Sequence, residues 1–214
     1  MSAVASTQFT ESTSMRPFFT IWTGQVFSLL GSELVQFALV WWLTTTTGSA
    51  TVLALATMMA VLPRVFVSPI AGALIDRWNR RWIMMAADGL SALAVVALGA
   101  LFALDAVQVW HIYTLMFIRS ACAAFHWPAM QASISLMVPE KHLSRVAGLN
   151  QALQGLGMIA APPLGALLLE LLPMQGILAV DVATAILAIA PLVFIQVPQP
   201  RRPAGRGEAS RASV

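Results

Sequence analysis

The stretch GALIDRWNRR, from Gly72 to Arg81, interrupts a largely apolar sequence with one acid and three arginines. Around it, the chain of 214 residues is 58% hydrophobic and 10% charged, with a mean hydropathy of +0.79. A soluble domain of this length carries about a quarter charged residues. The composition therefore indicates several membrane spans joined by short loops, and the charged stretch marks one of those loops.

Apolar runs of the length that crosses a bilayer, about 20 residues, lie on both sides of this loop. Backbone groups in lipid must be hydrogen-bonded within their own segment, so each run is expected to be an α-helix. The runs predict a six-helix bundle over residues 16–197, between disordered tails at 1–15 and 198–214. Its spans are Phe18–Leu43, Ala50–Ile75, Trp82–Leu104, Trp110–Pro128 (able to continue toward Val138), Val146–Leu169 and Gly176–Ile195.

The basic residues gather on one side of the predicted spans. Of the twelve Lys and Arg residues, ten lie before the first span, after the sixth, or in the second and fourth connections. Because basic loops stay in the cytoplasm, this distribution predicts a multi-pass protein of a bacterial cell (inner or plasma) membrane with both termini cytoplasmic. The expected partner is therefore the lipid bilayer, and nothing besides the basic tail suggests nucleic acid.

A short pattern occurs twice, as PIAGALI from Pro69 to Ile75 and as PPLGALL from Pro162 to Leu168. The two copies lie in the second and fifth spans, which run in opposite directions. Three spans followed by three of opposite sense form an inverted repeat, an arrangement common in transporters. The alternative is a chance match in a chain rich in Gly, Ala, Leu and Pro.

The Gly72–Arg81 loop combines features that a simple membrane anchor does not need. Gly72 and Asp76 share a helix face, where a glycine allows another helix to approach closely. An acid in this place can face a helix N-terminus or pair with arginine. Arg77, Arg80 and Arg81 can reach lipid headgroups or hold the loop against the bundle. A positive-inside anchor explains these arginines but not the opposing charge of Asp76.

Five charged residues fall inside the spans: Glu33, Arg64, Asp88, Arg119 and Asp181. A charge at the bilayer centre costs about 2.5–3.5 kcal/mol and persists only beside a partner or a wet cavity. Arg119 is therefore expected to face the interior of the bundle, where it would stabilise a nearby carboxylate in proton coupling or form a structural pair. Asp88 is expected to pair with Arg64.

If proton movement drives transport through the bundle, the acid that carries the proton is either Glu33 or Asp181. Each of these two acids could instead have a structural role. His126 titrates in the physiological range but could also be structural. Four glutamines are candidates to line a substrate cavity, because they fall on polar stripes of the first and fifth spans: Gln25, Gln36, Gln151 and Gln154. Gly157 with the Pro162–Pro163 pair is expected to bend or unwind the fifth span, as a flexible element or as an ordinary kink.

The loop G-x-x-x-D-R-x-x-R-R resembles the signature loop of the major facilitator superfamily, with Asn79 standing where glycine is frequent. FIRSACAAF, which contains Arg119, is similar to the intramembrane arginine motif of that family. GMIAAPPLGA, from Gly157 to Ala166, resembles its antiporter motif, with Gly157, Pro162 and Gly165 in place and Ala161 and Ala166 replacing glycines. GQVFSLLGSELVQFALVWWLTTTTGSA and VPEKHLSRVAGLNQ look like its macrolide-efflux and enterobactin-exporter branch.

This resemblance implies an all-α membrane protein that supplies the N-terminal six spans of a twelve-span fold. It implies proton-coupled efflux of drug-like molecules by alternating access, driven by the proton gradient without a cofactor. The partner would be the C-terminal half or a second copy of the chain. Two alternatives are a truncated, inactive remnant and a homodimeric half-transporter.

An intramembrane enzyme is disfavoured, because Ser68, Ser91 and Ser133 lack the glycine pattern of a serine nucleophile. No catalytic residue is therefore predicted. The single cysteine, Cys122, allows no paired-cysteine metal site, and no phosphate-binding glycine loop is present.

Overall fold

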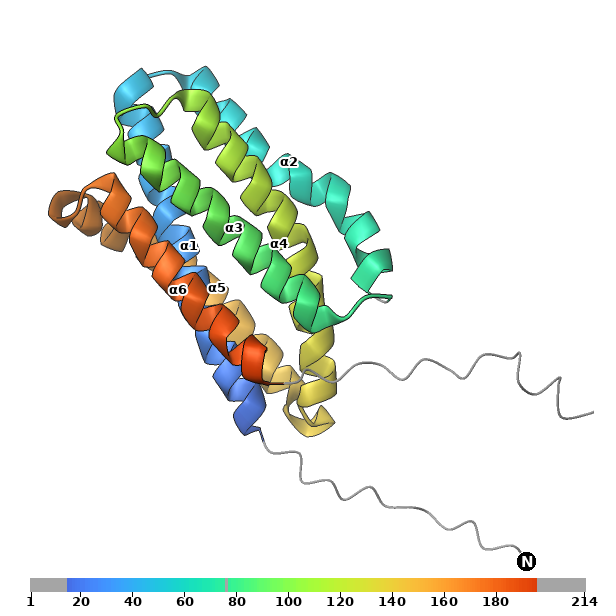
Figure 1. Ribbon diagram of the computed structural model, residues 1–214. Helices are drawn as coiled ribbons and strands as arrows, with labels where there is room; N and C mark the ends of the chain where they lie inside the picture. Colours follow the sequence, from blue (N-terminus) through green and yellow to red (C-terminus); the bar gives the residue numbers. More distant parts are fainter. Residues whose placement is uncertain (1–14, 76, 196–214) are drawn as a thin grey trace, which may run out of the picture.

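The computed structural model describes residues 15–75 and 77–195, and this part of the chain is all helical (Figure 1). Its six helices are α1 (Arg16–Thr47), α2 (Ala50–Ile75), α3 (Arg80–Ala103), α4 (Val109–Met137), α5 (Glu140–Leu171) and α6 (Met174–Phe194). They confirm the six predicted helical segments. The two predicted tails lie outside the described residues, except for Met15, which precedes α1.

Several helices are longer than the apolar runs that predicted them. α1 continues through four threonines to Thr47 and is capped by Gly48, whose φ of 59° is left-handed and whose N–H donates to Thr44 O. α5 begins at Glu140, six residues before the apolar run, and α4 passes through Pro128 to Met137. Helical hydrogen bonds continue into the polar interface, where the residues are no longer apolar and hydropathy does not indicate the end of the helix. The helix can also pass through Pro128, because a membrane helix tolerates a proline.

Five of the six described helices are long and apolar enough to cross a membrane, and α4 is the exception. The middle of α4 carries Arg119, Ser120 and His126, which lower its hydropathy. These side chains face the interior of the bundle, as shown below. Since α4 packs against both α2 and α3, it lies within the bundle like the other five helices.

The packing of the helices has the two-fold pattern of an inverted repeat. α2 packs extensively on α4, and α5 packs on α1. Likewise α3 packs on α4, α6 packs on α1, and α3 and α6 pack on each other. Exchanging α1, α2 and α3 for α4, α5 and α6 therefore maps α2–α4 onto α5–α1, α3–α4 onto α6–α1 and α3–α6 onto itself, as the repeat of PIAGALI and PPLGALL predicts.

Two hydrophobic clusters fill the two ends of the bundle. At the end where α1 begins and α6 finishes, the buried core includes Phe18, Ile21, Met84, Ala129 and Leu192. At the opposite end it includes Leu39, Leu43, Leu98, Ile112 and Leu178. Polar and charged side chains therefore concentrate between the clusters, at the middle of the helices.

Glycines bring α1 and α6 into close contact. A Cβ atom added at Gly24 would lie 2.7 Å from the backbone oxygen of Leu187. A Cβ added at Gly31 would overlap the hydroxyl of Thr184. Small residues let membrane helices approach in this way, and the close approach holds α1 against the buried polar groups of α6.

Candidate functional site

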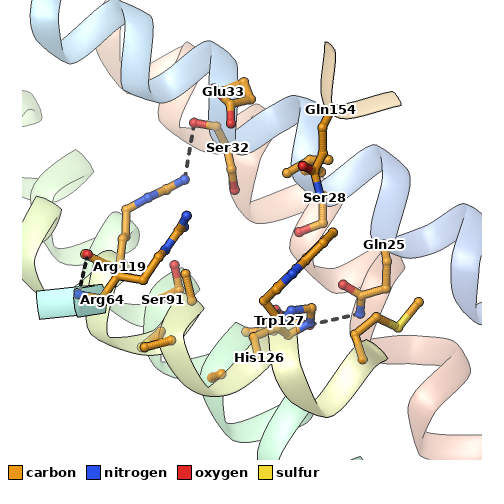
Figure 2. A pocket seen from close by; sticks show the side chains of 18 of the residues that line it. Gln25, Ser28, Ser32, Glu33, Arg64, Ser91, Arg119, His126, Trp127 and Gln154 are labelled. Carbon is orange, nitrogen blue, oxygen red and sulfur yellow. Dashed lines mark hydrogen bonds and ion pairs between the residues drawn. The ribbon is translucent and has the colours of Figure 1, made fainter. Parts of the chain in front are cut away.

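A cavity of about 590 Å³ lies at the middle of the bundle. Residues of α1, α2, α3, α4 and α5 line it, and many of them are polar or charged. Figure 2 shows side chains of α1 facing those of α2 and α4 across it. The polar lining includes Gln25, Ser28, Ser32, Glu33, Gln36, Arg64, Asp88, Ser91, Arg119, His126 and Gln154.

The first polar cluster of the site is an ion-pair network formed by Arg119, Asp181 and Ser32. An Nη atom of Arg119 donates to Asp181 Oδ2 at 2.6 Å, and the other Nη donates to the backbone oxygen of Ser32 at 3.3 Å. Ser32 Oγ donates to Asp181 Oδ1 at 3.1 Å. The Arg119 and Asp181 side chains are only 12% and 5% exposed. The network joins α4, α6 and α1 and identifies Asp181 as the acid beside Arg119.

The second cluster is a histidine network formed by Gln25, Asp88 and His126. Gln25 Nε2 donates to Asp88 Oδ2 at 3.1 Å, and His126 Nε2 lies 3.4 Å from Asp88 Oδ1. It joins α1, α3 and α4. The predicted pair of Asp88 with Arg64 is therefore wrong, because the carboxylate of Asp88 turns toward α1 and α4. An imidazole beside a carboxylate can accept and release a proton near neutral pH.

Glu33 lies on α1 without joining either network. Its side chain is half-buried against α5, where a Cβ added at Gly157 would lie 3.8 Å from Glu33 Cγ. The two acids named as proton candidates therefore differ in their surroundings. Asp181 is buried and paired with Arg119, whereas Glu33 lines the cavity.

The antiporter-like motif packs α5 tightly on α1. Gly157, Ala161 and Gly165 are buried at four-residue intervals, and a Cβ added at Gly165 would lie 2.5 Å from the ring of Phe37. Pro162 faces away and is exposed. Of the bend or unwinding expected for the fifth span, the unwinding is wrong, since α5 is one helix through both prolines. The exposed face of α5 leaves room for the proline rings.

Three of the four glutamines named as cavity candidates line the cavity: Gln25, Gln36 and Gln154. Gln151 is exposed and does not belong to the lining. It lies three residues before Gln154, and that offset carries its side chain onto a different part of the helix surface. The spacing of the stripe was too coarse to separate these two positions.

Arginines of the Gly72–Arg81 loop fasten the start of α3 to two other helices. Arg80 is buried and donates to the backbone oxygen of Ala132 in α4 at 2.7 Å. Arg81 donates to the backbone oxygen of Val193 at 2.5 Å, near the C-terminus of α6. Asn79, which stands where glycine is frequent, caps α3 by accepting from the Arg81 backbone N–H at 3.0 Å. These contacts indicate that Arg80 and Arg81 attach the loop to the bundle rather than bind lipid headgroups.

The other residues of this loop differ in how they are placed. Arg77 is exposed, and Asp76 lies outside the described residues. No heavy atom of the described chain beyond the immediate helix lies within 4 Å of a Cβ added at Gly72. The close approach that this glycine allows is therefore not used within the described part of the chain.

Sequence reasoning missed some members of the site. Asp88 and Arg64 were identified as charges within spans, and that alone could have placed both on a cavity wall. Trp22 donates from Nε1 to Asn150 Oδ1 at 2.7 Å and links α1 to α5 beside the cavity. No spacing in the sequence distinguishes this pair from other Trp and Asn residues.

A family model described as the Major Facilitator Superfamily matches residues 21–213. Macrolide efflux protein A of Streptococcus pyogenes is 38% identical over 182 residues, which cover 85% of this chain and 45% of that protein. Macrolide efflux protein A of Enterococcus faecalis is 36% identical over 152 residues, 71% of this chain and 47% of that protein. The multidrug efflux pump Tap of Mycolicibacterium fortuitum is 30% identical over 151 residues. The chain thus spans about half the length of the macrolide efflux relatives it matches.

Proposed function

Because the chain belongs to the Major Facilitator Superfamily, a family of transporters and not of enzymes, we propose that it forms half of an exporter of drug-like, amphipathic molecules. The observation that carries this proposal is the cavity of about 590 Å³, with its polar and charged lining at the middle of a membrane bundle. The efflux proteins among its relatives support the direction of transport. Apolar surface from Trp22 and Trp127, which also line the cavity, suits an amphipathic ligand.

Proton coupling is part of the proposal, and the ion-pair network offers a physical route. Asp181 holds α6 to α4 through Arg119 at 2.6 Å and to α1 through Ser32 at 3.1 Å. Protonation of Asp181 would remove the charge that holds Arg119, so the three helices could shift relative to one another. Glu33 and His126 remain the alternative proton carriers, because both line the cavity.

The chain is a bacterial multi-pass membrane protein, and we propose that its two termini lie in the cytoplasm. The helices place Arg16, Arg80 and Arg145 at the end of the bundle where α1, α3 and α5 begin. Positive charge of this kind accumulates on the cytoplasmic side of a membrane. Cysteine accessibility in intact cells would test this, since a cysteine at position 145 should react only after the membrane is permeabilised.

A complete cavity needs a second wall, because cavity-lining residues such as Arg64 of α2 and Met158 of α5 are exposed. We propose that the C-terminal half of a twelve-helix transporter supplies it, since the chain spans about half of its relatives. A second copy of this chain is the alternative. Crosslinking in native membranes distinguishes them: a band at twice the 22.9 kDa of this chain that forms only after crosslinking indicates a copy.

The transport proposal is tested by completing the fold. The chain would be joined to the C-terminal half of Macrolide efflux protein A of S. pyogenes in bacteria lacking their own drug pumps. We expect lower accumulation of a radiolabelled macrolide, restored to the control value by a protonophore. Arg119→Ala and Asp76→Ala should each abolish the effect. Wild-type efflux in both variants would disprove the coupling mechanism.

A direct measurement on the native product complements this experiment. An antibody against residues 7–15 would detect the protein in its own membranes. A band near twice 22.9 kDa under denaturing conditions would show that this sequence is part of a longer exporter. A band at the mass of the chain would leave a homodimer or an inactive remnant.

A further inference from the structure

The charges inside the bundle are not all compensated by the protein. Arg119 is paired with Asp181, and Asp88 is held by Gln25 and His126. Within residues 15–75 and 77–195, the side chains of Glu33 and Arg64 make no ion pair or hydrogen bond. These two residues are therefore the open charges of the cavity, one negative and one positive.

Arg64 is held in place by its backbone while its guanidinium is free to meet a ligand. It lies at mid-length in α2, directly after Pro63, and its backbone N–H donates to Ser120 Oγ of α4 at 3.3 Å. Its side chain is exposed on the cavity wall. In Figure 2 it extends beside Arg119 toward α1, the helix that carries Ser32 and Glu33.

An anionic group is the ligand chemistry that this position favours. The guanidinium of Arg64 presents a planar fork of donors that matches a carboxylate. Arg119 on the neighbouring helix is already paired with Asp181, whereas the charge of Arg64 has no acid partner within the described residues. A charge at this depth is costly without a partner or water, and a ligand anion would compensate it.

Glu33 provides the complementary group on the opposite wall. It lies on α1, next to Gly157 of α5, while Arg64 belongs to the α2–α4 side of the cavity. A ligand amine can therefore pair with Glu33 while an anionic group of the same molecule pairs with Arg64. The aromatic surfaces of Trp22 and Trp127 lie along the same cavity.

We propose that Arg64 and Glu33 form two opposite recognition points, so that the cavity prefers zwitterionic amphipathic molecules to molecules with one charge. The inference rests on the proposed function only in taking this cavity as the substrate cavity. It adds to that function the substrate class and the residues that select it. Binding can be measured without transport, so the two proposals can fail separately.

The test uses three fluorescent probes that share one dansyl group and one alkyl chain. Nε-dansyl-lysine carries both an amine and a carboxylate, dansylcadaverine lacks only the carboxylate, and dansyl-aminocaproic acid lacks only the amine. Binding to the full chain in phosphatidylcholine nanodiscs would be followed by dansyl fluorescence. We expect Nε-dansyl-lysine to bind about tenfold more tightly than either single-charge probe, as one charged hydrogen-bonded contact implies.

Two variants assign the recognition points. Arg64→Gln should weaken Nε-dansyl-lysine about tenfold while leaving dansylcadaverine unchanged, which also shows that the cavity is intact. Glu33→Gln should weaken Nε-dansyl-lysine and leave dansyl-aminocaproic acid unchanged. Arg145→Gln and Glu170→Gln remove the same charges at exposed positions outside the cavity and should change nothing.

Two outcomes would overturn the proposal. Equal binding of the three probes to the wild-type chain would show that the cavity does not discriminate between ligands by their charged groups. Loss of Nε-dansyl-lysine binding when anionic phosphatidylglycerol replaces zwitterionic phosphatidylcholine would show that an anionic lipid headgroup occupies the Arg64 position. A macrolide-efflux experiment that fails while the probes still discriminate would instead contradict the transport proposal alone.

Discussion

Arg119 and Arg64 lie on neighbouring helices of the same bundle, yet the protein treats them in opposite ways. Arg119 is 12% exposed and bonded to Asp181 and to the backbone of Ser32. Arg64 is exposed on the cavity wall, and its side chain makes no polar contact within the described residues. A membrane arginine can thus be stabilised by an acid of the fold or by a wet cavity. The first arrangement holds helices together, and the second keeps a charge for a partner.

Two glycines show a similar contrast, because one is packed against another helix and the other has no neighbouring helix within the described chain. Gly24 lies where α1 meets α6, and a side chain there would collide with the backbone of α6. Gly72, at the end of α2, meets nothing within 4 Å in the described chain. One glycine is needed by the fold of this chain, whereas the other is available to a helix from outside it.

The largest expected effect on stability comes from removing Arg119, the arginine that is paired with an acid of the chain. Arg119→Ala should lower the free energy of unfolding by about 3–5 kcal/mol, because Asp181 is left buried without its counter-charge. The measurement is an SDS titration of the chain, followed by tryptophan fluorescence. Replacing both residues, with Arg119→Met and Asp181→Leu, should recover much of the loss. A double variant as unstable as the single one would contradict this account of the ion-pair network.

The glycine contrast predicts the next effect. Gly24→Val should cost about 1–3 kcal/mol of unfolding free energy through overpacking against α6. Gly72→Val should change it by no more than about 0.5 kcal/mol. Both variants add the same side chain to a helix, so the difference isolates the contact. Equal losses in the same titration would mean that Gly72 also packs against this chain.

A smaller effect is expected in the histidine network. Gln25→Leu removes the donor to Asp88 and should cost about 1.5 kcal/mol, the low end of the range for a hydrogen bond to a charged group. Gln151→Leu is the matched control, since Gln151 is exposed outside the cavity. Thermal unfolding of the two variants in the same detergent measures the difference, and similar melting temperatures would argue against a stabilising role for the network.

The smallest effect on stability should come from replacing Arg64, the arginine that has no acid partner within the described residues. Arg64→Gln should leave the unfolding free energy within about 0.5 kcal/mol of wild type, because the Arg64 side chain makes no polar contact within the described residues. The SDS titration used for Arg119→Ala provides the comparison. A loss above about 2 kcal/mol would reveal an acid partner inside the chain and remove the basis of the zwitterion proposal.

Local patterns were sufficient for much of this structure. Apolar runs located all six helices, and the paired PIAGALI and PPLGALL segments anticipated the two-fold packing of α2 on α4 and of α5 on α1. The helix ends could not be predicted as well, because hydrogen-bonded turns extend beyond the apolar run. The polarity of α4 is explained only once its neighbours are known.

The pairing of the intramembrane charges could not be obtained in the same way. Asp88 could face several helices. The sequence favoured Arg64 as its partner, whereas in the structure its carboxylate lies beside Gln25 and His126. Arg119 and Asp181 are 62 residues apart, and their contact depends on the rotation and crossing of α4 and α6. A helical stripe shows which residues share a face, but not which face of which helix it will meet.

The sequence by itself determined that the chain is a set of membrane helices, and where its charges lie along them. This follows from local physics, since apolar length and backbone hydrogen bonding depend on each segment alone. Only the tertiary structure decided which charges are compensated and which remain open to a cavity. That outcome depends on distances of a few ångströms between distant segments, and helix packing sets those distances.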